Sequence, residues 1–73
     1  MPNNQPVAQF RIGLVTASVF ENEGQNRPFH TVTITRTFKN GDDWGHTNSF
    51  SHADLPLVEK LVKRCESWIA ANQ

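Results

Sequence analysis

The stretch FHTVTITRTF, residues 29–38, decides the fold. Threonine occupies every odd position from Thr31 to Thr37, and Val32 and Ile34 stand between the threonines. Side chains on a β-strand alternate between the two faces of its sheet. One face of this strand is therefore apolar, and the other is a row of hydroxyl groups. The pattern predicts a sheet that is covered on one side only and whose polar side is open to a partner.

An earlier strand is predicted over residues 8–20. Its apolar positions change parity between Ile12 and Val15, and Gly13 lies between them. A bulge or bend at Gly13 would bring both apolar sets to the core and would break the strand in two. The polar segment that follows, residues 21–28, is expected to be a loop.

A further strand is predicted over residues 44–50, after the turn sequence KNGDD. Its register depends on the length of the turn. A two-residue Asn-Gly loop would pair Thr31 with Phe50 and would put a ring among the threonines. A three-residue loop over residues 40–42 gives the pairs Val32–Phe50, Ile34–Asn48, Arg36–His46 and Phe38–Trp44. We favour the three-residue loop because burial on one face penalises a slip of one residue, and a five-residue loop keeps the same facing.

This register gathers hydroxyl side chains on one surface of the sheet. They are Thr16, Ser18, Thr31, Thr33, Thr35, Thr47 and Ser49. Threonine favours strands, so such a surface can be an uncommitted solvent face. The functional alternative is that the hydroxyls follow a sugar–phosphate chain, because hydroxyl side chains regularly donate to phosphates.

A helix is predicted over residues 55–71. Asp54 is the expected N-cap, with Pro56 tolerated in the first turn, and Ser51 is the rival cap. The apolar stripe at helical spacing comprises Leu55, Val58, Leu61, Val62, Cys65, Trp68 and Ile69. We expect this stripe to cover the apolar side of the sheet, including Val15, Val19, Val32, Ile34 and Phe50.

The composition limits the class of protein. The 73 residues make one small domain, over residues 8–73, behind a disordered tail over residues 1–7. The net charge is zero, which argues against a strongly electrostatic nucleic-acid binder. The single cysteine, Cys65, allows no internal disulfide and fits a reducing cytoplasm. No apolar run approaches the length of a membrane span.

No motif for catalysis or metal binding stands out. His30, His46 and His52 lack zinc-ligand spacing, and we interpret the pair Asp42 and Asp43 as a polar turn. Cys65 lies on the apolar stripe, where a buried and unactivated thiol is expected. Phosphate loops and nucleophile elbows are absent. We therefore expect no enzyme activity, no metal and no cofactor.

The residues around the turn are more informative. Trp44 is predicted to lie beside Arg36, Phe38, Lys39 and His46. Its ring could cap the open end of the core, or it could be a platform on which a base stacks, flanked by cations that meet phosphates. Arg36 has the parity of the core residues, so it must pass the end of the helix or point into a dimer groove. The rings of Phe20 and Phe29 have the parity of the hydroxyls, and they could stack on bases or pack at an edge or dimer contact.

Several short segments of the chain are informative through their order and spacing. They are Phe10-Arg11-Ile12-Gly13, Arg36-Thr37-Phe38-Lys39, and Gly45-His46-Thr47-Asn48-Ser49-Phe50 leading through Asp54 into the helix. This order resembles the single-stranded-DNA-binding domain of the transcriptional coactivator positive cofactor four and its small bacterial and phage relatives. The resemblance covers nearly the whole chain from Phe10 to Ile69 and rests on order, spacing and a few residue types.

The resemblance implies a fold and a set of site residues. The implied fold is α+β, with a curved antiparallel sheet of three to four strands followed by one C-terminal helix, paired into a homodimer. The implied DNA contacts are Arg36, Lys39 and His46, with Trp44 as the stacking ring and with Arg27 and His30 where the family tends to carry lysines. Together with the hydroxyls of Thr33, Thr35 and Thr47, these residues form the predicted site.

We therefore expect a cytoplasmic homodimer that binds single-stranded nucleic acid, DNA or RNA, with little sequence preference. A role in transcription, replication or recombination would follow from the resemblance. The alternative is a protein-interaction module that uses the polar face or an exposed strand edge to bind a partner strand.

Overall fold

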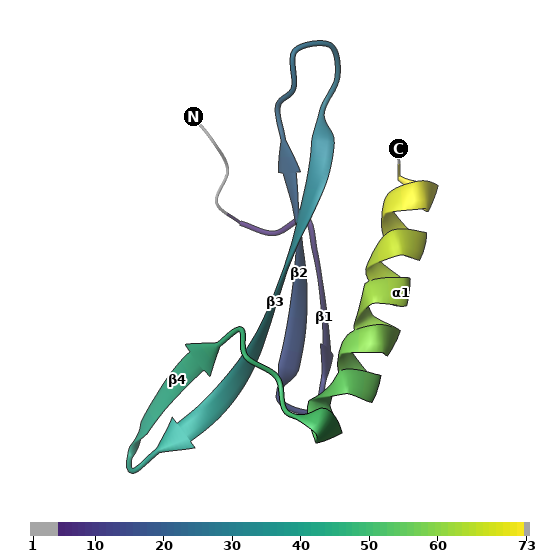
Figure 1. Ribbon diagram of the computed structural model, residues 1–73. Helices are drawn as coiled ribbons and strands as arrows, with labels where there is room; N and C mark the ends of the chain where they lie inside the picture. The colour runs from purple at the N-terminus through teal and green to yellow at the C-terminus, as the bar shows by residue number, and fades with distance from the viewer. Residues whose placement is uncertain (1–4, 73) are drawn as a thin grey trace.

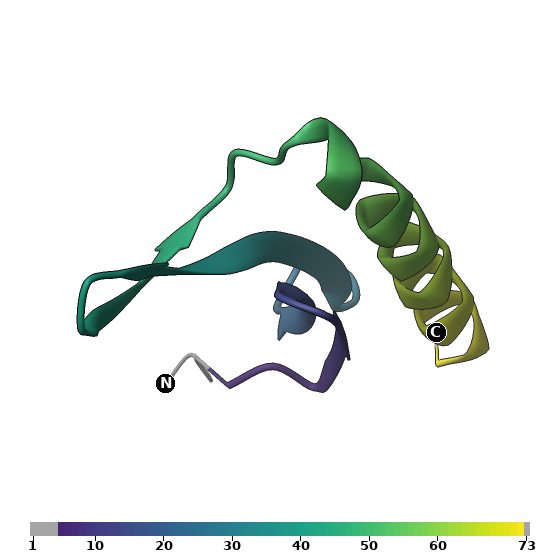
Figure 2. The same ribbon diagram turned by 90° about the horizontal axis from the view of Figure 1, so that it is seen from below.

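The computed structural model describes residues 5–72 as one antiparallel sheet followed by a helix (Figure 1). The elements are β1 (Ala8–Ile12), β2 (Val15–Asn22), β3 (Phe29–Asn40), β4 (Asp43–Thr47), a short 3₁₀ turn (His52–Asp54) and α1 (Leu55–Ala71). The strands lie in the order β1-β2-β3-β4. The predicted α+β class and the C-terminal helix are confirmed. The sheet is curved, and α1 lies to one side of it (Figure 2).

The strand predicted over residues 8–20 is a tight hairpin. Gly13 has φ +60° and begins the turn, so that Ile12 pairs with Val15. Glycine adopts this left-handed conformation without steric cost. The hairpin explains the change of parity in the sequence, since Phe10 pairs directly with Ala17 and both apolar sets face the same way.

The predicted register of the last hairpin is wrong by one residue. The loop is Gly41 and Asp42, and Asn40 pairs with Asp43. Arg36 therefore pairs with Thr47, Thr37 with His46 and Lys39 with Trp44, rather than Arg36 with His46 and Phe38 with Trp44. Gly41 has φ +65°, and no non-glycine residue in the described chain has positive φ. A two-residue hairpin turn with glycine in its first position meets that requirement.

Phe38 and Gly45 give a second reason for this register. The two residues pair directly, and a Cβ atom added to Gly45 would lie 2.6 Å from Cζ of Phe38. The Phe38 ring therefore packs directly on Gly45, and a larger residue at position 45 would displace the ring. β4 ends at Thr47, so Asn48, Ser49 and Phe50 connect it to the helix instead of extending the strand.

The core lies between α1 and the first two strands. Leu61 and Cys65 of the helix are buried against Val15, Ala17 and Val19 of β2. Phe10, Ile12, Ile34, Phe50, Leu57, Val58, Trp68 and Ile69 pack around this cluster. The prediction that the helix stripe covers the apolar side of the sheet holds only in part, because α1 packs mainly on β1 and β2 and less on β3. Leu55 and Val62 are half exposed, and Val32 is 39% exposed.

Ser51 and Asp54 form a capping box at the 3₁₀ turn before α1. The Asp54 carboxylate accepts hydrogen bonds from the Ser51 N–H and the Ser51 hydroxyl, both at 2.9 Å. The Asp54 N–H in turn donates to the Ser51 carbonyl at 2.9 Å. Ser51 thus caps the 3₁₀ turn. Asp54 occupies the N-cap position of α1, as predicted, but its side chain makes no cap hydrogen bond to α1 because it is directed back toward Ser51.

The tail predicted over residues 1–7 lies partly outside the described residues. In its described part, the Val7 N–H donates to the Val19 carbonyl at 2.8 Å, so pairing with β2 begins before β1 itself. Within residues 5–72, no helix has both the length and the apolar character needed to cross a membrane.

Candidate nucleic-acid interface

The register places one row of polar side chains on the side of the sheet away from α1. Residues that pair directly in an antiparallel sheet point to the same face, and Thr16 pairs with Thr35 and Ser18 with Thr33. We call this surface the hydroxyl face. Its hydroxyl residues are Thr16, Ser18, Thr31, Thr33, Thr35 and Thr37. Thr47 pairs with Arg36 and so points to the helix side, which corrects its predicted place on this face.

The charges of the strands divide between the two faces. In β1 to β4, the hydroxyl face carries Arg11 and Lys39 and no carboxylate. The strand acids Glu21 and Asp43 pair with His30 and Asn40, which have the parity of the helix side. A chain with zero net charge thus presents cations alone on the strands of one surface, which favours an anionic ligand there.

The hydroxyl face is hollowed at its centre. One hollow of about 370 Å³ is lined from all four strands. Arg11 of β1 borders it on one side and His46 of β4 on the other, with Thr16 of β2 and Thr35 of β3 between them. We call it the hydroxyl hollow. Its cation, hydroxyls and imidazole can all donate hydrogen bonds to a phosphate.

Some of these hydroxyls are already engaged and others are open. Ser18 accepts a hydrogen bond from the Gln9 amide at 2.9 Å, and Thr31 accepts one from the Asn22 amide at 3.0 Å. Thr37 Oγ1 lies 3.4 Å from His46 Nδ1. Within residues 5–72, the hydroxyls of three threonines have no hydrogen-bond partner, namely Thr16, Thr33 and Thr35. These groups are available to a ligand.

Aromatic rings lie at both ends of the hydroxyl face. Trp44 is 61% exposed at the β3–β4 hairpin, and Lys39 Nζ lies 5.8 Å from the centroid of its ring. Phe29 is 51% exposed at the other end of β3, and Phe20 has the same facing. Trp44 therefore does not cap the core. An exposed indole beside a cation has the chemistry of a stacking platform.

The structure brings together some of the predicted site residues and separates others. On the hydroxyl face lie Thr33, Thr35, Lys39, Trp44 and His46. On the helix side lie His30, Arg36 and Thr47, and Arg27 is exposed in the β2–β3 loop. The predicted cluster of Trp44 with Arg36 and Phe38 is wrong, because the register shift puts the indole on the opposite face from both residues.

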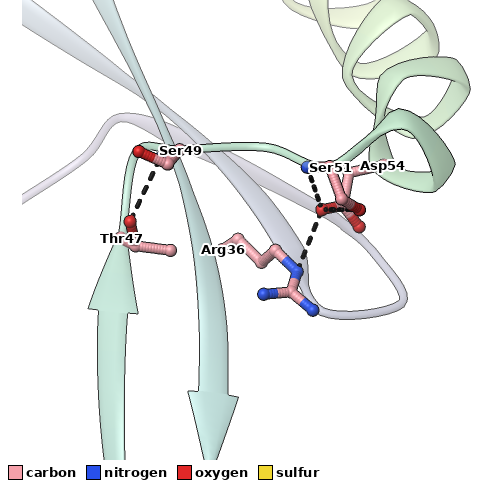
Figure 3. A network of polar contacts seen from close by, with 5 residues as sticks. All are labelled: Arg36, Thr47, Ser49, Ser51 and Asp54. Atoms are coloured by element: carbon pink, nitrogen blue, oxygen red, sulfur yellow. Dashed lines mark hydrogen bonds and ion pairs between the residues drawn. The ribbon is translucent and has the colours of Figure 1, made fainter.

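Arg36 is held by the start of the helix (Figure 3). Its Nε atom lies 3.0 Å from Oδ2 of Asp54, which is the same oxygen that Ser51 contacts. Hydrogen bonds from Ser51, together with the Arg36 charge, hold the pKa of Asp54 below its ordinary value of 3.8, against the opposing effect of burial. Arg36 is therefore a structural residue that joins β3 to α1.

His30 has a packing role of the same kind. Its side chain is 8% exposed, Nε2 lies 3.7 Å from the Glu21 carboxylate, and the ring meets Trp68 edge-on at 5.8 Å. His30 and Trp68 close the far end of the core.

Sequence reasoning did not include Arg11, Thr16 or Thr37 among the site residues. Arg11 was the easiest to find, since it alternates with the apolar Phe10 and Ile12 and must face away from the core. Thr16 and Thr37 follow from the same alternation in β2 and β3.

The described chain offers little for metal or thiol chemistry. Residues 5–72 hold no group of three His, Cys, Asp or Glu side chains that could bind a metal ion. Cys65 is buried in the core, and burial raises the pKa of its thiol.

Comparisons with protein-family models, curated proteins and solved structures find no match to this chain. The functional argument rests on the geometry of the hydroxyl face.

Proposed function

We propose that the protein binds single-stranded nucleic acid, DNA in the first place, across the hydroxyl face and with little sequence preference. The observation that supports this most is the separation of charge. The strands of this face combine open hydroxyls with Arg11 and Lys39 and carry no carboxylate, although the chain as a whole is neutral.

The bases and the phosphates of the nucleic acid would contact different kinds of side chain. A base stacks on the exposed Trp44 indole, and Phe29 offers a second ring at the other end of the face. Phosphates meet Arg11, Lys39 and the open hydroxyls of Thr16, Thr33 and Thr35. Hydroxyl and cation contacts to phosphates carry no sequence information, so affinity would vary little with sequence.

The proposed molecule is a homodimer. A groove of about 550 Å³ runs between β3 and α1, lined by Val32, Ile34, Val62, Ile69 and Ala70. This groove leaves Val32 and Val62 39% and 49% exposed on a domain whose fully buried core is small. A second copy would cover it and add the burial that a chain of this size lacks.

Fluorescence anisotropy with labelled oligo-dT at low salt tests the binding proposal. Since stacking is worth about 1–3 kcal/mol per base, Trp44→Ala should weaken binding by about 5- to 150-fold. Leu14→Ala is the control, because Leu14 is also exposed but lies at the β1–β2 turn. Absence of binding by the wild type at tens of micromolar protein would sink the proposal. It would favour a protein partner on the same face or on a strand edge.

A further inference from the structure

A second cationic surface lies on the helix, outside the hydroxyl face. A hollow of about 610 Å³ borders α1 and β1, lined by Phe10, Lys60, Lys63, Arg64, Ser67 and Trp68. We call it the basic hollow. It contains three of the chain's seven cations. Within residues 5–72, no carboxylate lies within ion-pair distance of Lys60, Lys63 or Arg64.

The acids of α1 do not line the basic hollow. Glu66 lines the groove beside β3, and Glu59, one turn before Lys63, lines neither the groove nor the basic hollow. Ion pairs between helix charges of opposite sign would have been a local alternative. Their absence leaves the cations of the basic hollow available to an anionic partner.

The basic hollow and the hydroxyl hollow share one lining residue of β1, whose ring points to the helix side. Phe10 lines both of them, and Arg64 lies over its ring with Cζ 4.8 Å from the centroid. Phe10 belongs to β1, which is an edge strand of the sheet. Its neighbour Arg11 lines the hydroxyl hollow. A nucleic acid that leaves the hydroxyl hollow past Arg11 therefore crosses only β1 before it reaches Lys60, Lys63 and Arg64.

We infer that a bound single strand continues over the edge of β1 and places its next phosphates in the basic hollow. This inference rests on the proposed function and extends the site to the helix. The cations match the charge of a phosphate backbone, and the Arg64–Phe10 pair offers a flat surface on which a base can stack. Short strands would use the hydroxyl face alone, and longer strands would use both hollows.

The salt dependence of binding distinguishes a nucleic acid that contacts the hydroxyl face alone from one that also contacts the basic hollow. Each cation that neutralises a phosphate of a single strand contributes about 0.7 to the slope of log K against log salt concentration. Arg11 and Lys39 alone give a slope of about −1.4, and the three further cations bring it to about −3.5. We propose anisotropy titrations with oligo-dT of about 4 and about 16 nucleotides, which span the usual site sizes of single-strand-binding folds.

The decisive variant is Lys60→Gln/Lys63→Gln/Arg64→Gln. For the long oligonucleotide we expect its slope to return to about −1.4, with at least about tenfold weaker binding at low salt, and for the short one we expect no change. The double variant Lys60→Gln/Lys63→Gln keeps the Arg64–Phe10 contact and should lose about 1.4 of the slope. The short oligonucleotide is the internal control for both variants, because it uses the hydroxyl face alone.

Two results would overturn the inference while leaving the proposed function intact. One is a wild-type slope for the triple variant on the long oligonucleotide. The other is an equal loss of affinity for the short and the long oligonucleotide, which would mean that the cations act through the overall electrostatic field of the protein. In both cases binding would stay sensitive to Trp44→Ala. If the wild type binds neither oligonucleotide, the proposed function fails and the inference falls with it.

Discussion

The guanidinium of Arg36 and the carboxylate of Asp54 form an ion pair, with Nε 3.0 Å from Oδ2, that joins the helix side of β3 to the start of α1. The same carboxylate oxygen accepts the Ser51 N–H and hydroxyl. Asp54 is buried, and the Arg36 side chain is 33% exposed. One carboxylate therefore organises the junction between sheet and helix.

Replacing Arg36 by Met should lower stability without changing nucleic-acid binding. The substitution removes one of the three contacts to Asp54, and Arg36 does not lie on the hydroxyl face. Asp54→Ala should lower the midpoint of urea unfolding further, because it removes all three contacts. The double variant should lose less than the sum of the two losses. Reduced oligo-dT affinity of folded Arg36→Met would contradict its assignment as a structural residue.

Stability should fall in acid, in part through Asp54. Its pKa in the folded protein lies below the ordinary 3.8, so the unfolded chain takes up the proton first. The stability that this group contributes is complete above about pH 4 and is lost as the pH falls through the lowered pKa. Urea unfolding between about pH 5 and pH 2 measures the loss. Asp54→Asn should flatten the profile, whereas Asp42→Asn in the exposed turn should not; equal profiles for the two variants would argue against the prediction.

The parts of the fold that the sequence predicts are those with a local signal. The alternation of threonine with Val32 and Ile34 defines the two faces of β3, and the helical spacing defines α1 to the residue. Gly13 marks a change of parity, and only the geometry shows that this change is a hairpin turn rather than a bulge.

The register of β4 and the partner of Arg36 have no such local signal. Asn40-Gly41 is a strong turn dipeptide, yet the loop contains Gly41 and Asp42, and a shift of one residue moves Trp44 and His46 to the other face. Arg36 and Asp54 are far apart in the sequence, and nothing near either residue identifies the other. The hydroxyl face was predictable from alternation, but the residues that belong to it from β4 depend on the register.

Gly45→Ala should destabilise the β3–β4 hairpin. The new methyl group would meet the Phe38 ring, whose Cζ lies 2.6 Å from the position of the added Cβ. We expect a loss of about 1 kcal/mol, the low end for overpacking, because Phe38 is half-buried and its ring can swing outward. The same substitution in a Phe38→Ala background should cost much less. A double-mutant cycle by urea unfolding measures this coupling, and additive losses would show that the ring does not constrain Gly45.

Val62→Asp should keep the protein monomeric. Val62 is half exposed in the groove between β3 and α1, so a monomer tolerates the charge, whereas a second copy over the groove would bury it. An unpaired buried charge is strongly disfavoured, and the new carboxylate would also lie near Glu66. We expect sedimentation velocity to show a dimer for the wild type and a monomer for Val62→Asp. Ser67→Asp is the matched control, since Ser67 lines the opposite flank of the helix and its charge should leave the dimer intact. If both variants sediment like the wild type, the groove is not the dimer interface, and a monomeric wild type would show that the apolar groove is left open in solution.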